Sequence, residues 1–473
     1  MLGKNRIEHS TESRRLTAIN HNKQVDINRK ILARLIDVVC FLGKQELAFR
    51  GHRENEGSLN KGNYCEILDL LAKEEQFVKE HFLTNSVFKG TSHDIQNDLI
   101  HCVTTVLNSH ILKELQITNF ISIQADETTD VSCQSQMSLI FRYIIDNKIE
   151  ERFIGFFDVS KNKTAASLSE VILNAFSKWN IGQKVVCQTY DGASVMAGEK
   201  NGVQSIIQNI YPMAICIHCY AHQLNLVLLH GAKTIKDILK YTNEEQTTLR
   251  RLTFEIIDSL IVQINIRFKD FEKLEFVEII NEKMFASCKV HFPEENLRQL
   301  FKYYPDIFDK DRLKNELYII YADPLKYFAP LEFIDYIFKN ELQEVYQEVT
   351  KLIQLVLTIP ATTASSERSM STLKRIKSFL RNSMTNDRLS SLSTLAIKKK
   401  NVRKFKHIGP DEFYGLAELL PIEERCTLEE LKEKKNKFIT SITLCKYQRD
   451  ILEVDTSEYK VPVPNDLQKG VTD

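Results

Sequence analysis

The sequence lacks the features of a membrane or secreted protein. No apolar run approaches the roughly 18 residues needed to span a bilayer. No hydrophobic segment follows the basic start at residues 1–6, so we expect no signal peptide. Ten cysteines are scattered along the chain with one close pair, Cys216 and Cys219, which is not a disulfide framework. These absences predict a nuclear protein, with the cytoplasm as the alternative and no membrane partner.

The sequence also has no excess of charge of either sign. Lys and Arg together number 63, as do Asp and Glu, so DNA binding could rest only on local basic patches. Tryptophan occurs once, as Trp179, and no internal repeat is present. Of the 473 residues, 43% are hydrophobic, which is enough to build the cores of two or three domains.

Apolar residues follow helical spacing up to residue 119 and alternate from residue 120 onward. This change predicts an α-helical N-terminal region ahead of an α/β core with a mixed sheet. Strands are expected at 120–126, 137–145, 152–159, 185–191 and 214–219, with a hairpin turn at 146–148 and helices at 165–178, capped by Thr164, and 202–210. A right-handed crossover would set the strand ending at Asp191 beside the strand ending at Asp126. That is the layout of a ribonuclease-H-like core.

The rest of the chain is predicted to be helical. Residues 221–350 show no strand pattern, and further helices are expected up to 381 and over 386–400. The predicted regions are 1–119 (helical N-terminal region), 120–230 (first part of the core), 231–344 (helical insertion), 345–405 (end of the core) and 406–473 (a tail of unassigned role).

Three carboxylates are candidates for one site. Asp126 and Asp191 each end a predicted strand, and Glu367 lies at the start of a predicted helix. Clustered carboxylates suit hard divalent cations, and two such ions can drive phosphodiester chemistry. Aspartates at strand ends are also ordinary turn residues. Glu127 and Asp130 are alternatives to Asp126 that spacing leaves open.

Cysteine and histidine gather at a second place, in Cys216, His218, Cys219 and His222. These side chains could ligate zinc, but a zinc site usually needs a second ligand pair farther along the chain, and none is evident. We therefore expect Cys219 and His222 to have a structural role beside the carboxylates, in preference to a zinc site or a redox pair of Cys216 and Cys219.

A basic stretch over 374–406 contains one acidic residue, Asp387. It could follow a phosphate backbone, or it could be the solvated surface of a helix pair. The candidate nucleic-acid-binding residues are Lys374, Arg375, Lys377, Arg381, Lys398, Lys399 and Lys400.

The chain resembles the hAT superfamily of transposases. Within it, the chain resembles the proteins with a DUF4371 domain, as in the zinc finger MYM-type group. The resemblance covers roughly 30–230 and 345–400 and rests on motifs in family order. They are Ala48–His52 with Asn63 and Tyr64, Gln124–Asp130, Tyr190–Gly198, His218–Leu226 and Ala364–Ser371.

This resemblance implies a ribonuclease-H-like fold with Asp126, Asp191 and Glu367 as catalytic and metal-binding residues. It implies Mg²⁺ or Mn²⁺ as the cofactor of an active enzyme, cut-and-paste chemistry on DNA, and no small-molecule substrate. It also implies a dimer or higher oligomer formed through the C-terminal region, where the motif residues Ser366, Arg368, Met370 and Leu373 are the candidates.

The chain departs from the family pattern in two respects. Its first residues contain no Cys/His cluster of the zinc-finger type, and the insertion over 221–350 looks short and has no tryptophan. We therefore expect a truncated, transposase-derived nuclear protein that associates with DNA and dimerises but does not transpose. The alternatives are an active, Mg-dependent DDE-type transposase and a protein-interaction scaffold without enzymatic activity.

Overall fold

The computed structural model describes residues 2–398, except for 52, 55–56, 85–88, 242–245, 323–328, 379–380 and 382. The described chain forms two units, one within residues 1–107 and one over residues 108–398. The predicted tail at 406–473 lies outside the described residues. No described helix is both long enough and apolar enough to cross a membrane.

The first unit is helical, as predicted. It contains α1 (Leu2–Lys44), α2 (Asn63–Glu74), α3 (Gln76–Thr84) and the beginning of α4 (His93–Ile117). The apolar stripe of α1 is buried, including Leu35 and Leu42. Before α2 the backbone of Gly62 has φ 93°, and a Cβ there would lie 2.1 Å from the backbone nitrogen of Gly51. Only glycine allows these two backbone segments to approach so closely.

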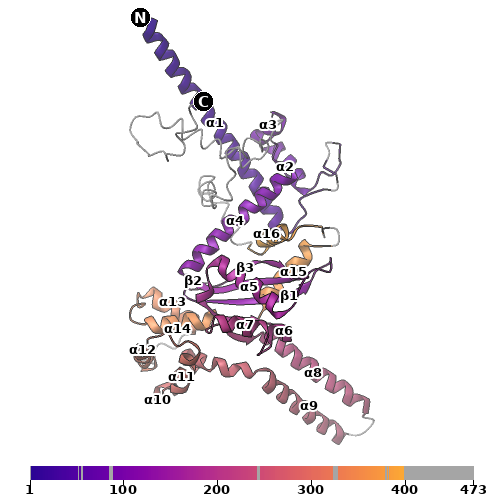
Figure 1. The fold of residues 1–473 in the computed structure, drawn as a ribbon, viewed down its shortest axis with the longest axis vertical. Coiled ribbons are helices and arrows are strands. Elements are labelled where there is room, and N and C mark those ends of the chain that lie inside the picture. Colours follow the sequence, from indigo (N-terminus) through magenta and orange to yellow (C-terminus); the bar gives the residue numbers. More distant parts are fainter. Residues whose placement is uncertain are drawn as a thin grey trace. The chain divides into compact units, whose positions relative to one another are not determined.

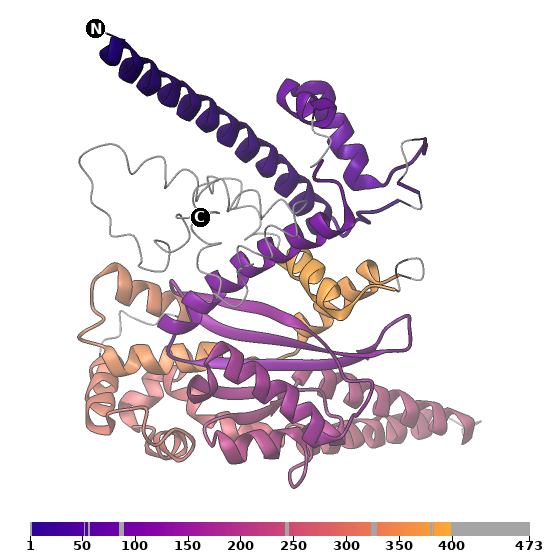
Figure 2. The same cartoon turned by 45° about the horizontal axis from the view of Figure 1, so that its top comes forward.

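The second unit is built on a five-stranded mixed sheet (Figures 1 and 2). Its strands lie in the order β3-β2-β1-β4-β5. Pairing is antiparallel between β1 and β2 and between β2 and β3, and parallel from β1 to β4 and from β4 to β5. This confirms the predicted hairpins followed by a crossover. The strands are β1 (Ile121–Thr129), β2 (Ser135–Ile145), β3 (Lys148–Asp158), β4 (Val185–Tyr190) and β5 (Ile215–His218).

Most strand limits differ from the prediction by one to four residues, and the largest differences are at the end of β1 and the start of β3. β1 continues through Asp126 to Thr129, because β2 remains paired with it along this whole stretch. β3 begins at Lys148, so the hairpin turn has two residues rather than three. Those residues, Asp146 and Asn147, have φ values of 48° and 58°, the left-handed geometry that matches strand twist in a two-residue hairpin.

One face of the sheet is covered by the crossover helices. These are α5 (Ala165–Trp179), α6 (Ser194–Ala197) and α7 (Val203–Ile210), with a 3₁₀ turn η1 (Gly182–Lys184) before β4. Thr164 caps α5 as predicted, its side chain accepting a hydrogen bond from Ser167 N. Alternate residues of the strands, such as Ile123 and Leu139, pack here with Ile172 of α5.

The described residues between β5 and residue 359 form helices and no strand, in agreement with the sequence pattern. Apolar residues of β4 and β5, including Val186 and Ile215, pack against them and join Leu352 in a second core. The elements are α8 (Tyr220–Tyr241), α9 (Gln246–Arg267), η2 (Lys269–Ile280), η3 (Glu282–Met284), α10 (Phe285–Val290), α11 (Glu294–Tyr303), α12 (Lys310–Ala322), α13 (Pro330–Lys339) and α14 (Gln347–Thr358).

Two last helices return to the sheet. They are α15 (Ala364–Ile376), which contacts β1 and β2, and α16 (Asn386–Ile397), which contacts β3. Ser390 of α16 donates from its hydroxyl to Phe156 O and accepts from Phe156 N. The chain therefore carries Glu367 back to the strand that holds Asp126.

The only tryptophan of the sequence reports on the α5 side of the sheet. Trp179 is 6% exposed and meets Phe141 of β2 edge-on, with ring centroids 6.2 Å apart. We expect its native emission to be blue-shifted and shielded from iodide, and to shift to the red in one transition as denaturant unfolds this core. Native emission quenched as readily as that of free tryptophan would contradict this packing.

Candidate active site

The register of β1 and β4 brings two acids to the same edge of the sheet. Gln124 pairs with Thr189, so Asp126 and Asp191 each lie two residues beyond this pair. Side chains alternate along a strand, so Asp126 shares the face of Gln124 and lies opposite the core that contains Ala125. Asp126 was predicted to end its own strand, but β1 continues beyond it. Asp126 lies instead beside the point where the neighbouring strand β4 ends.

Glu367 reaches this edge from the first turn of α15. A hydrogen bond of 2.6 Å between the hydroxyls of Ser138 and Ser369 joins this helix to the sheet. Ser138 is the residue that pairs with Asp126 across β1 and β2. The acid on α15 is thus fixed relative to the acid on β1 by a short, buried contact.

The three carboxylates influence one another electrostatically. The pKa of Asp126 is raised to about 6, first by burial, then by the negative charges of Asp191 and Glu367. The backbone N–H of Glu127 donates to Asp126 Oδ1 at 3.0 Å and opposes this rise. Like-charged carboxylates at one site destabilise each other unless a proton or a cation intervenes.

The two alternatives to Asp126 are already neutralised by lysines. Glu127 forms an ion pair with Lys163 at 2.6 Å, and Asp130 forms one with Lys377 at the same distance. Asp126 forms no ion pair with a described residue, and its charged neighbours Asp191, Glu367 and Glu127 are acids. The structure thus distinguishes Asp126 from Glu127 and Asp130, which sequence spacing could not do.

The donor chemistry fits a hard divalent cation, since carboxylate oxygens are the ligands that Mg²⁺ prefers. The side chains do not yet form a closed set of ligands. Among the residues that the structure describes, no three His, Cys, Asp or Glu side chains are gathered closely enough to hold an ion. An ion would therefore have to draw the carboxylates of Asp126, Asp191 and Glu367 together.

Cys219 connects the two segments that carry Asp191 and Glu367. Its backbone N–H donates to Tyr190 O at 3.0 Å, and its buried Sγ accepts from Thr363 N at 3.3 Å. Next to it, Tyr220 N donates to Ala361 O at 3.1 Å. One short stretch thus holds the end of β4 against the start of α15.

The other Cys and His candidates are held apart by different partners. Cys216 is buried in β5, and His222 lies beside Gly192, with ring Cδ2 3.6 Å from the position of a Cβ there. His218 Nδ1 is hydrogen-bonded to Asp270 Oδ2. Burial opposes ionisation of Asp270, but bonds from His218 and Lys273 lower its pKa to about 2. This arrangement is an ion-paired anchor for η2.

Glu151 on β3 forms hydrogen bonds with several segments, which the sequence did not indicate. Its Oε1 accepts from Gln124 Nε2 and from an Arg142 guanidinium nitrogen, each at 2.9 Å. Its Oε2 accepts from the hydroxyl of Ser365. Arg142 also donates to Leu357 O at 2.9 Å. Glu151 thus joins three strands to the beginning of α15. The only signal in the sequence was its position in an outer strand of the sheet, next to Arg152.

Three of the four predicted dimerisation residues belong to the core of this chain. Ser366, Met370 and Leu373 are buried where α15 packs on the sheet, so they are not available to a second copy. Arg368 alone is exposed, and it donates to Ser365. The prediction for the three buried residues is wrong because the helix uses this face for its own fold.

Two predicted DNA-binding lysines are also buried. Lys377 is enclosed by Asp130 and Gln134, and Lys398 is buried, with a pKa lowered to about 7 by burial. Neither can reach a phosphate, which corrects the prediction. Lys374 and Arg375 are exposed. Arg381 is half-buried, with a pKa lowered by burial, and Lys399 and Lys400 lie outside the described residues.

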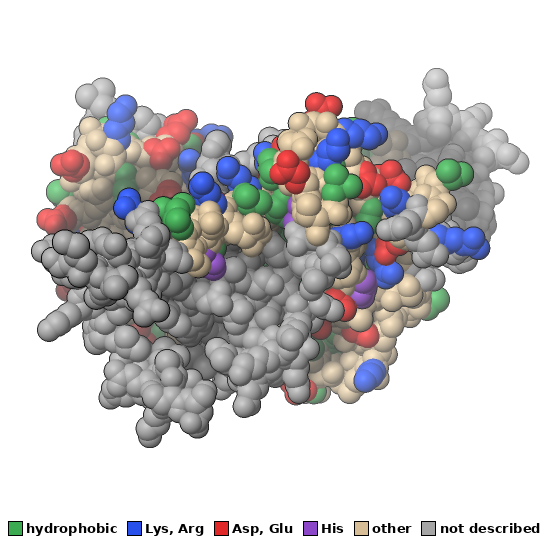
Figure 3. Space-filling model, turned by 90° about the horizontal axis from the view of Figure 1, so that it is seen from above, with side chains coloured by type: hydrophobic (Ala, Val, Ile, Leu, Met, Phe, Trp, Pro, Cys, Tyr) green, Lys and Arg blue, Asp and Glu red, His purple; other side chains and the backbone are tan. Residues whose placement is uncertain are grey.

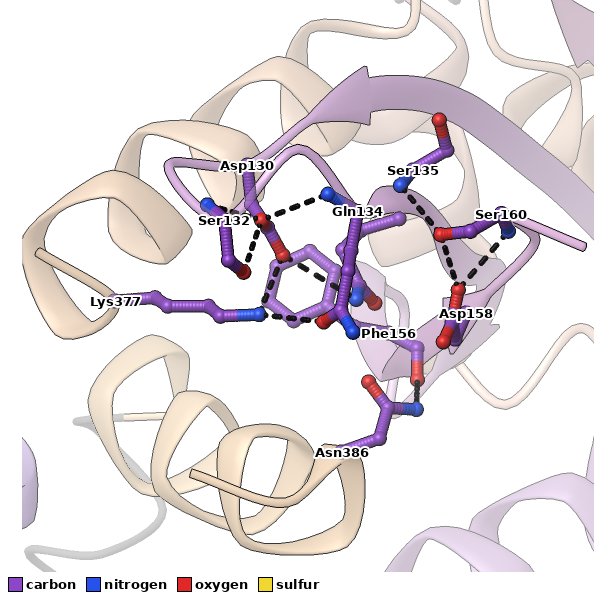
Figure 4. A network of polar contacts seen from close by, with 10 residues as sticks. Asp130, Ser132, Gln134, Ser135, Phe156, Asp158, Ser160, Lys377 and Asn386 are labelled. Carbon is purple, nitrogen blue, oxygen red and sulfur yellow. Dashed lines mark hydrogen bonds and ion pairs between the residues drawn. The ribbon is translucent and has the colours of Figure 1, made fainter. Parts of the chain in front are cut away.

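The ion pair of Asp130 and Lys377 fastens the end of α15 to the β1–β2 connection (Figure 4). Lys377 Nζ also donates to Gln134 Oε1 at 2.9 Å, and Asp130 Oδ1 accepts from the Ser132 hydroxyl at 2.7 Å. Burial opposes ionisation, but these donors keep the pKa of Asp130 below its usual value. Both side chains are almost completely buried, so this ion pair stabilises the fold and is not part of the charged surface.

Residues 4–202 match the DUF4371 family, described as the ZMYM1/FAM200, RNase-like domain. Residues 311–400 match the hAT family C-terminal dimerisation region. Over these two stretches the chain is similar to hAT-family, transposase-like proteins. The match to the RNase-like domain includes Asp126 and Asp191, and the match to the dimerisation region includes Glu367.

Relatives of this hAT-like chain carry two kinds of name. It is 23% identical over 212 residues to the human 52 kDa repressor of the inhibitor of the protein kinase, covering 42% of this chain and 27% of that protein. It is 28% identical over 131 residues to the putative AC transposase of Zea mays, covering 26% of this chain and 16% of that protein. The matched stretches thus span less than a third of either relative.

Replacing Lys377 with Met should destabilise the second unit strongly. The change leaves Asp130 buried without its cation, which typically costs about 3–5 kcal/mol of unfolding free energy. The double variant with Asp130→Asn should recover part of this loss. Lys374→Met on the exposed side of the same helix is the matched control and should have little effect. Equal stability of K377M and K374M in denaturant titrations would contradict the burial of the ion pair.

Asp126→Asn should stabilise the protein near neutral pH. The folded protein holds the Asp126 proton more tightly than the unfolded chain, so ionised Asp126 opposes folding above a pH of about 6. Removing that charge should raise the unfolding free energy by roughly 1–3 kcal/mol at about pH 7.5, and the gain should vanish near pH 4. Thermal melts across this range are the measurement.

Asp158→Asn is the control of opposite sign. The Ser160 hydroxyl and backbone N–H hold the pKa of Asp158 below its usual value, so this carboxylate favours folding in its charged form. The variant should give no gain near neutral pH. A pH-independent effect of Asp126→Asn would show that its carboxyl does not sense the other two acids.

Proposed function

We propose that this protein is a transposase-derived nuclear protein that associates with DNA, forms dimers and binds a divalent cation between Asp126, Asp191 and Glu367. The observation that carries the proposal is the geometry that brings Asp126 and Asp191 to one end of the sheet and Glu367 beside them on α15. In agreement with it, the pKa of Asp126 is raised first by burial and then by the charges of the other two acids. A nuclear location follows from the proposed association with DNA. One relative is named as a repressor and another as a transposase, and both names suit this proposal.

Each acid would have a separate role in holding the ion. Asp126 is held on β1 by its pairing with β2, Asp191 by the end of β4, and Glu367 by the first turn of α15. Bound Mg²⁺ or Mn²⁺ would supply the activation of water and the stabilisation of a leaving 3′ oxygen that phosphodiester chemistry needs. The protein itself orients the three carboxylates and keeps Glu127 and Asp130 paired elsewhere.

Exposed cations near the acids give DNA a place to bind. Lys374 lies seven residues after Glu367 on α15, so it is on the same side of the helix about 10 Å away. Arg375 is its exposed neighbour. A phosphate backbone crossing the acids could therefore also reach these two side chains. On the face shown in Figure 3, by contrast, basic and acidic side chains are intermixed, which suits no long phosphate track.

We propose further that the protein does not complete transposition. Lys377 and Lys398, two of the predicted DNA-binding residues, are buried, and the segment over 221–350 contains no tryptophan. An active DDE-type transposase is the second candidate, favoured by the mutual influence of the three carboxylates. The third, a scaffold without a nucleic-acid role, is disfavoured by the exposed cations beside the acids.

Purified protein, labelled hairpin-ended or nicked DNA and Mn²⁺ distinguish these candidates. We expect DNA retention that falls with salt, and no strand cleavage. Lys374→Glu with Arg375→Glu should weaken retention roughly tenfold. Lys339→Glu, an exposed lysine of α13, should weaken it much less.

Two other results would overturn parts of the proposal. Mn²⁺-dependent cleavage that is lost in Asp126→Asn would establish the active transposase instead. Absence of any salt-dependent retention would leave the scaffold as the surviving candidate.

A further inference from the structure

The helical segment between β5 and α14 contains the same short sequence pattern twice. In each copy a large apolar residue precedes a lysine, and an asparagine and a glutamate follow it. The copies are Leu313–Glu316 in α12 and Phe338–Glu341 at the end of α13, and their lysines are Lys314 and Lys339. Because the two sequences are so alike, only their structural surroundings decide which lysine another protein can reach.

This pattern is the substrate sequence of one class of enzyme. The carrier enzyme of the small ubiquitin-like modifier holds the apolar side chain in a groove and draws the lysine that follows to its catalytic cysteine. It pairs the carboxylate two residues farther along with basic side chains. Lysine accepts such modifiers through its flexible amine. All three side chains must therefore lie outside the protein core, and the segment must be able to extend.

The copy in α12 does not meet these conditions. Leu313 is completely buried, and Glu316 is 4% exposed. The carboxylate of Glu316 accepts a hydrogen bond from the backbone N–H of Glu348 at 2.9 Å. The amine of Lys314 is paired with Glu294, also at 2.9 Å. Recognition of this copy would require the core around α12 to open.

The copy at the end of α13 (Figure 1) lies on the surface. Phe338 is 38% exposed, and the side chains of Lys339, Asn340 and Glu341 are exposed as well. Neither the amine of Lys339 nor the carboxylate of Glu341 has a partner among the residues that the structure describes. The apolar residue, the lysine and the acid are thus all accessible to a second protein.

The backbone of this copy is also able to extend. α13 ends at Lys339. After it, Glu341 N donates to Phe338 O at 3.3 Å, which is long for a hydrogen bond. Glu341 has φ 56°, a left-handed conformation that is unfavourable for a residue with a side chain. Helix ends fray, and extension here would relieve that conformation, while the completely buried Ile337 keeps the rest of α13 in place.

We propose that Lys339 is a conjugation site for a small ubiquitin-like modifier. After the ammonium has lost one proton to water, the amine of Lys339 attacks the thioester between the C-terminal carboxyl of the modifier and the cysteine of its carrier enzyme. An isopeptide bond forms, the C–S bond breaks, and an amine proton passes to the departing thiolate. An activating enzyme makes the thioester beforehand with ATP. This site does not depend on the acids or on DNA association.

Reconstituted conjugation of the full chain tests this site. The purified protein is incubated with the activating enzyme, the carrier enzyme, the modifier and ATP, and the product is mapped by mass spectrometry. We expect one modifier for each chain, attached to Lys339. Lys339→Arg should abolish the product, and Lys314→Arg, the same change in the occluded copy, should leave it unchanged. Both variants keep the positive charge, and Trp179 emission should show that both fold.

Glu341→Gln distinguishes recognition from simple exposure. This variant leaves Lys339 exposed but removes the carboxylate that the carrier enzyme pairs with, so the initial rate should fall roughly tenfold. The proposal is overturned by the absence of any product, by a product that persists in Lys339→Arg, or by an unchanged rate in Glu341→Gln. Asp126→Asn should be conjugated like the wild type, so a failure here says nothing against the acidic site.

Discussion

The parallel pairing of β1 with β4 is the constraint on which the candidate site depends. It fixes Asp126 and Asp191 at equivalent positions two residues beyond their last common pair. A slip of one residue in β1 would turn Asp126 into the core beside α5 and bring Ala125 to the open face. The alternation of Ile121, Ile123 and Ala125 into that core opposes such a slip, so the hydrophobic pattern itself positions the acids.

The third acid depends on polar contacts in addition to the buried apolar face of α15. Cys219 holds the segment before α15, Glu151 holds its first turn through Ser365, and Asp130 holds its end through Lys377. Each contact joins residues far apart in the sequence, and each is at least partly buried. Losing one of these contacts would loosen α15 and move Glu367, so the acidic site is sensitive to residues that do not themselves touch it.

Local pattern was enough to predict much of the fold but not the polar contacts of the site. Helical spacing, strand alternation and the Thr164 cap predicted the order of elements, and the crossover set Asp191 beside Asp126. The pairing of Lys377 with Asp130 spans 247 residues, and no local pattern encodes it. For the same reason the burial of Met370 was missed, because an amphipathic helix does not show whether its apolar face meets its own sheet or another chain.

The electrostatic influence of the three acids on one another, although they come from distant segments, can be measured directly by carboxyl ¹³C NMR. Protein labelled at Asp Cγ would be titrated, with the Asp126 signal assigned by its loss in Asp126→Asn. We expect Asp126 to titrate at about 6 and its pKa to fall in Asp191→Asn and in Glu367→Gln. An ordinary pKa for Asp126, or a raised one that neither substitution changes, would contradict this expectation.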